Sequence, residues 1–194
     1  SNTDTKLLLE HYQENTIDYL TNKCINQHGL LIYHNMGTGK TLTGLSIIFK
    51  NITYKNININ DVVIICPDMI KISWIKESSK LNLKFLKKTF MNYEEFYYSI
   101  INSIHNNNTD ILKNKFVIFD EGHHIIPYLK RDNNNYYYNY IEILSKTKNV
   151  LILTGTPFYY SKFSAIDICY LLNICEGTKN SFPIIDDLFQ QKYI

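Results

Sequence analysis

The chain of 194 residues has little arginine, tryptophan or cysteine, and it contains no long apolar run. No stretch approaches the roughly 18 continuous apolar residues of a membrane span, so we expect no membrane partner. The four cysteines form no C-x-x-C pair and no zinc-like spacing, which predicts reduced, mostly buried thiols rather than a metal site. The polar start of the chain carries no signal-peptide hydrophobic region. These absences favour an intracellular protein in a reducing compartment.

Charge and composition set further bounds. The net charge of +2 is too small to indicate nucleic-acid binding by itself, and Arg131 is the single arginine. Hydrophobic residues make up 45% of the chain and charged residues 20%, which is ordinary for one globular domain of this length. The abundance of Asn, Ile, Tyr and Lys indicates an A/T-rich genome, so the Asn runs carry little structural information.

Apolar runs alternate with segments of helical periodicity. Uninterrupted runs predict buried strands at 30–33, 61–66, 115–119 and 149–153, with a short one at 88–91. Helices are expected at 41–50, 68–80, 93–105, 140–146 and 163–174, with Asp68 as the N-cap of the second. This alternation predicts an α/β fold with a parallel β-sheet and helices on both faces. Ligands of such sheets bind at the carboxyl ends of the strands.

A glycine loop joins the first predicted strand to the first predicted helix. Glycines let the backbone approach a phosphate closely, and a helix N-terminus offers N–H donors to the anion. Lys40 would then contact the β- and γ-phosphates of a nucleotide, and the Thr41 hydroxyl would bind Mg²⁺. His34 occupies the place of the first glycine in the full pattern, and an ordinary glycine turn is the alternative. The nucleotide-binding residues are expected to be Met36, Gly37, Thr38, Gly39, Lys40 and Thr41.

An acidic pair, Asp120-Glu121, ends the predicted strand at 115–119. A carboxylate at a strand end can hold Mg²⁺, which is the role expected of Asp120. Glu121 would orient the attacking water or act as its general base. His123 is close enough to reach the γ-phosphate region or the loop after the next strand. A pair that only terminates the strand is the alternative, and the upstream glycine loop makes it the weaker one.

A second threonine loop, Thr154-Gly155-Thr156-Pro157, follows the predicted strand at 149–153. Its hydroxyl groups could bond the loop of the acidic pair and couple nucleotide state to backbone movement. A structural turn is the alternative, and the two roles are compatible. Trp74 is expected to pack against the sheet, with base stacking as the alternative. The glycine loop, the acidic pair and this loop each follow a strand end, so we expect them to converge.

These motifs together resemble motifs I, II and III of superfamily 2 helicases and translocases, in order and at suitable spacing. The pattern of Pro67, Trp74 and Glu77 is similar to motif Ia of the Swi/Snf-type branch. Tyr12-Gln13 resembles the adenine-contacting element of that branch, because an amide can both donate to and accept from the adenine edge. The sequences of the loops at 34–41 and 153–158 look most like those of ATPases of large DNA viruses. These include ATPases of the poxvirus early transcription factor small subunit type and the nucleoside triphosphate phosphohydrolase I type.

The resemblance implies a RecA-like P-loop lobe over residues 1–180 that uses ATP and Mg²⁺. Residues 181–194 would connect it to a second RecA-like lobe, which supplies the arginine fingers. Arg131 lies in the loop after motif II, the wrong place for a finger, so we expect weak ATP binding and very slow hydrolysis by this lobe alone.

The resemblance also implies partners. Residues Pro67, Asp68 and Met69 would contact the backbone of double-stranded DNA without reading its sequence. Viral transcription proteins are further expected partners, in a virion or the host cytoplasm. Two alternatives stay open: an RNA helicase lobe, which the Pro67/Trp74/Glu77 pattern disfavours, and a non-hydrolysing platform, which the intact Lys40 and acidic pair disfavour.

Overall fold

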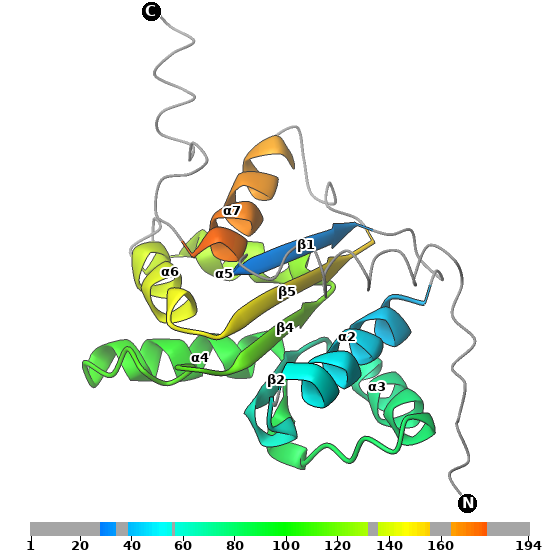
Figure 1. Ribbon diagram of the computed structural model, residues 1–194. Helices are drawn as coiled ribbons and strands as arrows, with labels where there is room; N and C mark the ends of the chain where they lie inside the picture. Colours follow the sequence, from blue (N-terminus) through cyan, green and yellow to red (C-terminus); the bar gives the residue numbers. More distant parts are fainter. Residues whose placement is uncertain (1–27, 34–38, 56, 132–135, 156–163, 178–194) are drawn as a thin grey trace, which may run out of the picture.

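A computed structural model describes residues 28–33, 39–55, 57–131, 136–155 and 164–177 of the chain (Figure 1). Its described strands form one sheet with the order β1-β5-β4-β2-β3, and every neighbouring pair is parallel. The strands are β1 (Gly29–Tyr33), β2 (Val62–Ile65), β3 (Phe90–Met91), β4 (Phe116–Asp120) and β5 (Asn149–Thr154). The predicted parallel α/β fold is confirmed.

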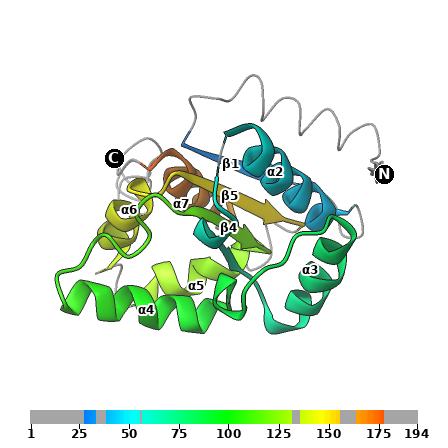
Figure 2. The same cartoon turned by 60° about the horizontal axis from the view of Figure 1, so that its bottom comes forward.

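Helices cover both faces of the sheet (Figure 1 and Figure 2). One face carries α2 (Lys40–Lys55) and α3 (Asp68–Lys80). The other carries α4 (Tyr93–His105), α5 (Ile126–Leu129), α6 (Tyr137–Ser145) and α7 (Ser164–Glu176). Side chains of a strand alternate between the two cores. In β4, Phe116 and Ile118 belong to the core under α2 and α3, and Asp120 shares their parity.

Local sequence explains where α4 begins. The Asn92 side chain accepts from the backbone N–H of Glu95 at 2.8 Å, and the Glu95 carboxylate accepts from the N–H of Asn92 at 2.9 Å. This reciprocal capping satisfies two N–H groups that the first helical turn leaves unpaired. The predicted bounds of this helix, 93–105, are confirmed.

The prediction of Asp68 as an N-cap residue is wrong. Pro67 is the N-cap of α3, with an extended backbone, and Asp68 is the first helical residue. The Asp68 carboxylate instead accepts a hydrogen bond from Nδ2 of Asn92 at 3.2 Å, so it ties the start of α3 to the start of α4. Its charge remains favourable in the first turn of the helix.

Three other helices extend beyond their predicted bounds. Helix α2 continues to Lys55, α6 begins at Tyr137 rather than Tyr140, and α7 ends at Glu176 rather than Ile174. Tyr137 is 1% exposed, and its hydroxyl accepts from Nδ2 of Asn173 at 2.9 Å. The polar sequence before this residue does not indicate its burial, which accounts for the earlier start of the helix.

The register brings three strand ends to one edge of the sheet. Tyr33 at the end of β1 lies opposite Thr154 at the end of β5, and Asp120 at the end of β4 lies opposite Leu153. The acidic pair begins with the last residue of β4, and the second threonine loop begins with the last residue of β5, so both start at this edge. Ligands of parallel sheets bind at this edge.

Candidate active site

Lys40 and Glu121 meet at the carboxyl edge of the sheet. Gly39 adopts φ +73°, a left-handed conformation that glycine takes without steric cost, and α2 begins immediately after it. Lys40, 8% exposed, places its Nζ 3.3 Å from Oε1 of Glu121. Thr41 is the next residue of the helix. The arrangement places the cation of Lys40, in the first turn of α2, beside a carboxylate that follows another strand, β4.

Asp120 is buried and surrounded by donors. Its Oδ2 accepts from Nε1 of Trp74 at 2.7 Å, and its Oδ1 accepts from the backbone N–H of Glu121 at 3.0 Å. Its backbone carbonyl accepts from the hydroxyl of Tyr93 at 2.8 Å. Both carboxylate oxygens and the main chain of this residue are therefore fixed by neighbours on α3, α4 and the following loop.

The electrostatic state of Asp120 follows from its burial. Loss of hydration raises the pKa of this carboxyl to about 6, and the charge of Glu121 acts in the same direction. The hydrogen bonds from Trp74 and from the N–H of Glu121, together with the charge of Lys40, oppose this rise. The net rise in the pKa means that the loss of hydration outweighs these favourable contacts.

The donor set fits Mg²⁺. A carboxylate and a hydroxyl are the hard oxygen ligands that this ion prefers, and Mg²⁺ commonly takes only one or two protein ligands beside phosphates and water. Among the described residues no group of three or more His, Cys, Asp or Glu could hold a metal ion. Asp120 and Thr41 therefore suit a shared, nucleotide-dependent ion better than a closed metal site.

Glu121 connects the acidic pair to the loop after β5. Its backbone is left-handed, with φ 53° and ψ 53°, which is uncommon for a residue with a side chain. Its Oε2 accepts from the N–H of Gly155 at 3.2 Å, while Oε1 faces Lys40. At the next residue, Gly122, an added Cβ would lie 2.2 Å from Cγ2 of Ile152. This turn therefore requires a glycine after the glutamate.

His123 and Thr154 join the same two loops by a second contact. Nδ1 of His123 lies 3.0 Å from Oγ1 of Thr154 and 3.6 Å from Oε2 of Glu121. Burial lowers the pKa of His123, as it does that of the neighbouring His124. A neutral imidazole at this position forms a hydrogen bond with the threonine hydroxyl. This bond connects the turn after β4 to the end of β5.

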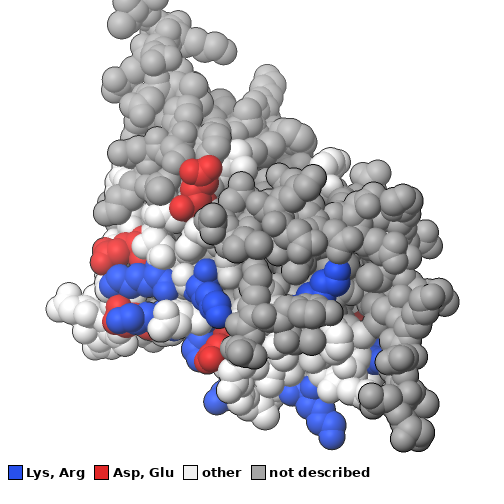
Figure 3. Space-filling model, viewed as in Figure 1, with Lys and Arg blue, Asp and Glu red and all other residues white. Residues whose placement is uncertain are grey.

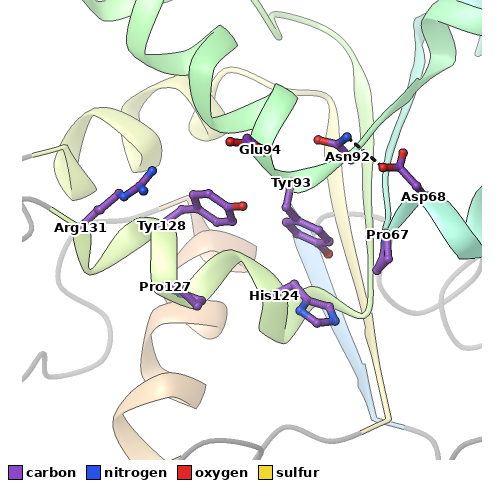
Figure 4. Close-up of a pocket in the computed structure, with 9 residues that line it drawn as sticks. All are labelled: Pro67, Asp68, Asn92, Tyr93, Glu94, His124, Pro127, Tyr128 and Arg131. Carbon is purple, nitrogen blue, oxygen red and sulfur yellow. Dashed lines mark hydrogen bonds between the residues drawn. The ribbon is translucent and has the colours of Figure 1, made fainter.

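The predicted nucleic-acid residues lie at the start of α3. Met69 is 90% exposed, and Pro67 and Asp68 line a cavity of about 510 Å³ (Figure 4). Its other lining residues are Asn92, Tyr93, Glu94, His124, Pro127, Tyr128 and Arg131.

On the molecular face in Figure 3, basic side chains lie in several separate places, some beside acidic ones.

The structure brings together most of the described site residues predicted from sequence: Lys40, Asp120, Glu121, His123, Thr154 and Gly155 share one edge. Their individual roles stay predictions. Gln13, Met36, Gly37, Thr38 and Thr156 lie outside the described residues. Trp74 packs in the core as expected, and its 0% exposure excludes the alternative of base stacking; its bond to Asp120 was not predicted. Tyr93 was also missed as a partner of Asp120.

Comparison with known proteins adds relatives to this geometry. A family model described as type III restriction enzyme, res subunit, matches residues 6–159. A protein of Acanthamoeba polyphaga mimivirus, assigned the name ATP-dependent RNA helicase L538, is 28% identical over 190 residues, which are 96% of this chain and 36% of that protein.

A solved structure, the Sulfolobus solfataricus SWI2/SNF2 ATPase core in complex with dsDNA, resembles this chain with a TM-score of 0.55. It is 20% identical, and the match covers 89% of this chain and 36% of that one. This likeness concerns the fold, which is that of a RecA-like ATPase core. The chain spans only about a third of the length of either relative.

No helix in the described parts of the chain is long and apolar enough to cross a membrane.

The family model covers most of the chain, including the glycine loop and the acidic pair. The chain therefore belongs to the family described as type III restriction enzyme, res subunit, and is an ATPase lobe of the superfamily 2 helicase type.

Proposed function

We propose that this chain is the first ATPase lobe of a DNA-dependent translocase or helicase of the Swi/Snf-like branch, which couples ATP hydrolysis to tracking along DNA or to viral transcription. The observation that carries the proposal is the meeting of Lys40 with Glu121 at 3.3 Å, beside the buried carboxylate of Asp120. A phosphate-binding lysine, a metal-binding carboxylate and a water-orienting carboxylate are the parts that phosphoryl transfer to water needs.

Each residue has a role in this proposal. The backbone of 36–41 and Lys40 hold the phosphates, Gln13 contacts adenine, and Thr41 with Asp120 holds Mg²⁺. When bound, Mg²⁺ neutralises the charge on the β- and γ-phosphate oxygens. Glu121 orients the water for in-line attack on the γ-phosphate. Lys40 then stabilises the charge that develops on the transferred group.

The contacts of Glu121 indicate how the site changes when ATP enters. The γ-phosphate competes with the Glu121 carboxylate for Lys40, because both anions seek the same cation. The N–H of Gly155 holds the other oxygen of Glu121 at 3.2 Å. Displaced from Lys40 but retained by Gly155, the carboxylate stays next to the phosphate, where an attacking water needs an acceptor.

Full activity requires a second lobe in this proposal. An arginine finger contributes about 10³–10⁵ in rate. Arg131 lies with its guanidinium carbon 5.1 Å from the ring centre of Tyr97 and 5.8 Å from that of Tyr128, a cation–π arrangement in another part of the lobe. Residues 1–180 form the lobe, and 181–194 lead toward the partner lobe.

The nucleic acid is proposed to be double-stranded DNA, contacted through the backbone at Pro67–Met69. The motif Ia pattern and the SWI2/SNF2 neighbour support this choice. An RNA helicase lobe is the second candidate, favoured by the name given to the mimivirus relative. A non-hydrolysing platform for transcription proteins is the third, and it would not need the Lys40–Glu121–Asp120 arrangement.

ATP turnover tests the proposal, measured with double-stranded DNA, with single-stranded RNA and without nucleic acid. The samples are this chain and a version extended toward its natural C-terminus, each with a Lys40→Ala control. We expect turnover only in the extended version, stimulated by DNA and abolished by Lys40→Ala. Stimulation by RNA alone would transfer the assignment to the RNA helicase. ATP binding without turnover in either version would favour the platform.

A further inference from the structure

Trp74 occupies an unusual position for a packing residue. It lies on α3 with a side chain that is 0% exposed, and its indole N–H donates to Oδ2 of Asp120 at 2.7 Å. The two residues are 46 positions apart and belong to different elements. Asp120 has the strand parity of Ile118, so its carboxylate enters the core under α2 and α3, where the indole already lies.

Helix α2 leaves room for this ring. At Gly44 an added Cβ would lie 2.7 Å from Cη2 of Trp74 and 3.2 Å from Cδ1 of Leu153. The glycine allows the six-membered end of the indole to reach α2 while the N–H points to β4. The ring is therefore confined from the side of α2, and its donor has a fixed direction.

The bond has chemical consequences for the carboxylate. A buried carboxylate without a donor on each oxygen loses its hydration uncompensated, and one free to rotate presents a different oxygen to a ligand. Trp74 supplies the donor for Oδ2, while the N–H of Glu121 supplies that for Oδ1. Each oxygen keeps a second lone pair, so the carboxylate is oriented without being saturated.

We propose that Trp74 is a positioning residue for magnesium binding: its indole N–H fixes the Asp120 carboxylate in the orientation that receives the nucleotide-bound ion. The inference rests on the proposed function, because it takes Asp120 as the metal ligand. Partners that orient a metal ligand typically contribute about 10–100-fold to metal affinity. If Trp74 served only for packing, changing it would lower the stability of the chain but would not selectively change the Mg²⁺ dependence of nucleotide binding.

The test separates the N–H group from the shape of the ring. Trp74 is the single tryptophan of the chain, so an analogue in which sulfur replaces the indole N–H, 3-benzothienylalanine, can be introduced there alone. Trp74→Phe is the genetically encoded counterpart. Binding of a fluorescent ATP analogue to the full chain is measured at increasing Mg²⁺ and in EDTA, with urea unfolding in parallel.

We expect the analogue to raise the Mg²⁺ concentration for half-maximal nucleotide binding by about tenfold or more, with binding in EDTA unchanged. In an Asp120→Asn background the same replacement should add nothing, because the group that it positions is gone. Tyr137→Phe is the matched control: it removes a buried hydroxyl that accepts from Asn173 at 2.9 Å, away from the site, and should leave the Mg²⁺ midpoint unchanged.

The remaining outcomes are distinct. A Mg²⁺ midpoint equal to that of the unmodified chain overturns the positioning role and leaves the proposed function intact. An equal shift in the Asp120→Asn background overturns it as well, since Trp74 would then act through general packing. If nucleotide binding by the unmodified chain does not depend on Mg²⁺, both the role of Trp74 and the metal site of the proposed function are overturned.

Discussion

Nζ of Lys40 lies 3.3 Å from Oε1 of Glu121, so the phosphate-binding lysine and the water-orienting carboxylate of the proposed site already form an ion pair. Glu121→Gln removes the negative charge that competes with phosphate. We therefore expect this variant to bind ATP several-fold more tightly, yet to lose turnover in a version extended to the second lobe. Equilibrium binding of a fluorescent nucleotide and steady-state phosphate release measure the two effects.

A matched control for this prediction is Glu142→Gln. Oε1 of Glu142, on α6, lies 3.9 Å from Nζ of Lys146, outside the proposed site and its motifs. The same loss of one negative charge there should change neither nucleotide affinity nor turnover. Undiminished turnover in the Glu121→Gln variant would remove Glu121 from the role of water-orienting residue.

Packing around the turn that carries Glu121 leaves no room for a side chain at Gly122. An alanine Cβ at this position would lie 2.2 Å from Cγ2 of Ile152, on the neighbouring strand. We expect Gly122→Ala to lower the free energy of unfolding by about 1–3 kcal/mol, as overpacked cores do. Urea denaturation monitored by circular dichroism gives this value.

The cause of that loss can be isolated with Ile152→Ala, which removes the opposing methyl group. The cavity makes this variant less stable than the unmodified chain. Adding Gly122→Ala to it should cost much less than the same substitution costs alone, giving a coupling energy of about 1 kcal/mol or more. Strict additivity of the two changes in unfolding free energy would show that the Cβ contact with Ile152 is not the reason for the glycine at position 122.

Asp120 makes the free energy of unfolding of the apo chain depend on pH. Its pKa of about 6 in the folded chain exceeds the ordinary value of 3.8, so the folded state binds the proton more tightly. The resulting stabilisation is fully present below about pH 4 and is lost as the pH rises through about 6. Relative to Asp120→Asn, the unmodified chain should gain up to about 3 kcal/mol between pH 7 and about pH 4, at about 1.4 kcal/mol per unit of pKa.

Urea unfolding of both chains across this pH range measures the difference. Subtracting the Asp120→Asn curve removes the contributions of carboxylates elsewhere that titrate alike in both chains. A stability difference that does not change with pH would mean that Asp120 titrates normally, and it would contradict the burial argument for this carboxylate.

The fold and the edge of the sheet that carries the site were predictable from local sequence. Val62–Ile65 and Phe116–Phe119 are apolar at every position and buried on both faces, so they could only be central strands. The polar motifs after them then had to lie at strand ends. The sheet order and the register, which decide that Lys40 faces Glu121, depend on long-range pairing that periodicity does not encode.

The finer features of the site depend on contacts across the core. Trp74 appeared as one apolar position of a helix, and only the packing of α3 against β4 reveals its bond to Asp120. The strand parity of Asp120 could have indicated that its carboxylate enters the core under α3. The left-handed backbone of Glu121 had no such signal, because this conformation is rarely taken by glutamate and here follows from the turn into Gly122.

The hydroxyl of Thr154, 3.0 Å from Nδ1 of His123, links the end of β5 to the turn that follows the acidic pair. Thr154→Val keeps the shape of the side chain and removes this bond. We expect ATP binding to persist within about twofold, while stimulation of turnover by double-stranded DNA in the extended version falls about tenfold, as a loss of about 1.4 kcal/mol of transition-state stabilisation would produce. Thr147→Val provides the control, because it removes a comparable contact at the opposite end of β5, where Oγ1 lies 3.2 Å from Nε2 of His28. Equal DNA stimulation in the two variants would show that the His123–Thr154 contact has only a structural role.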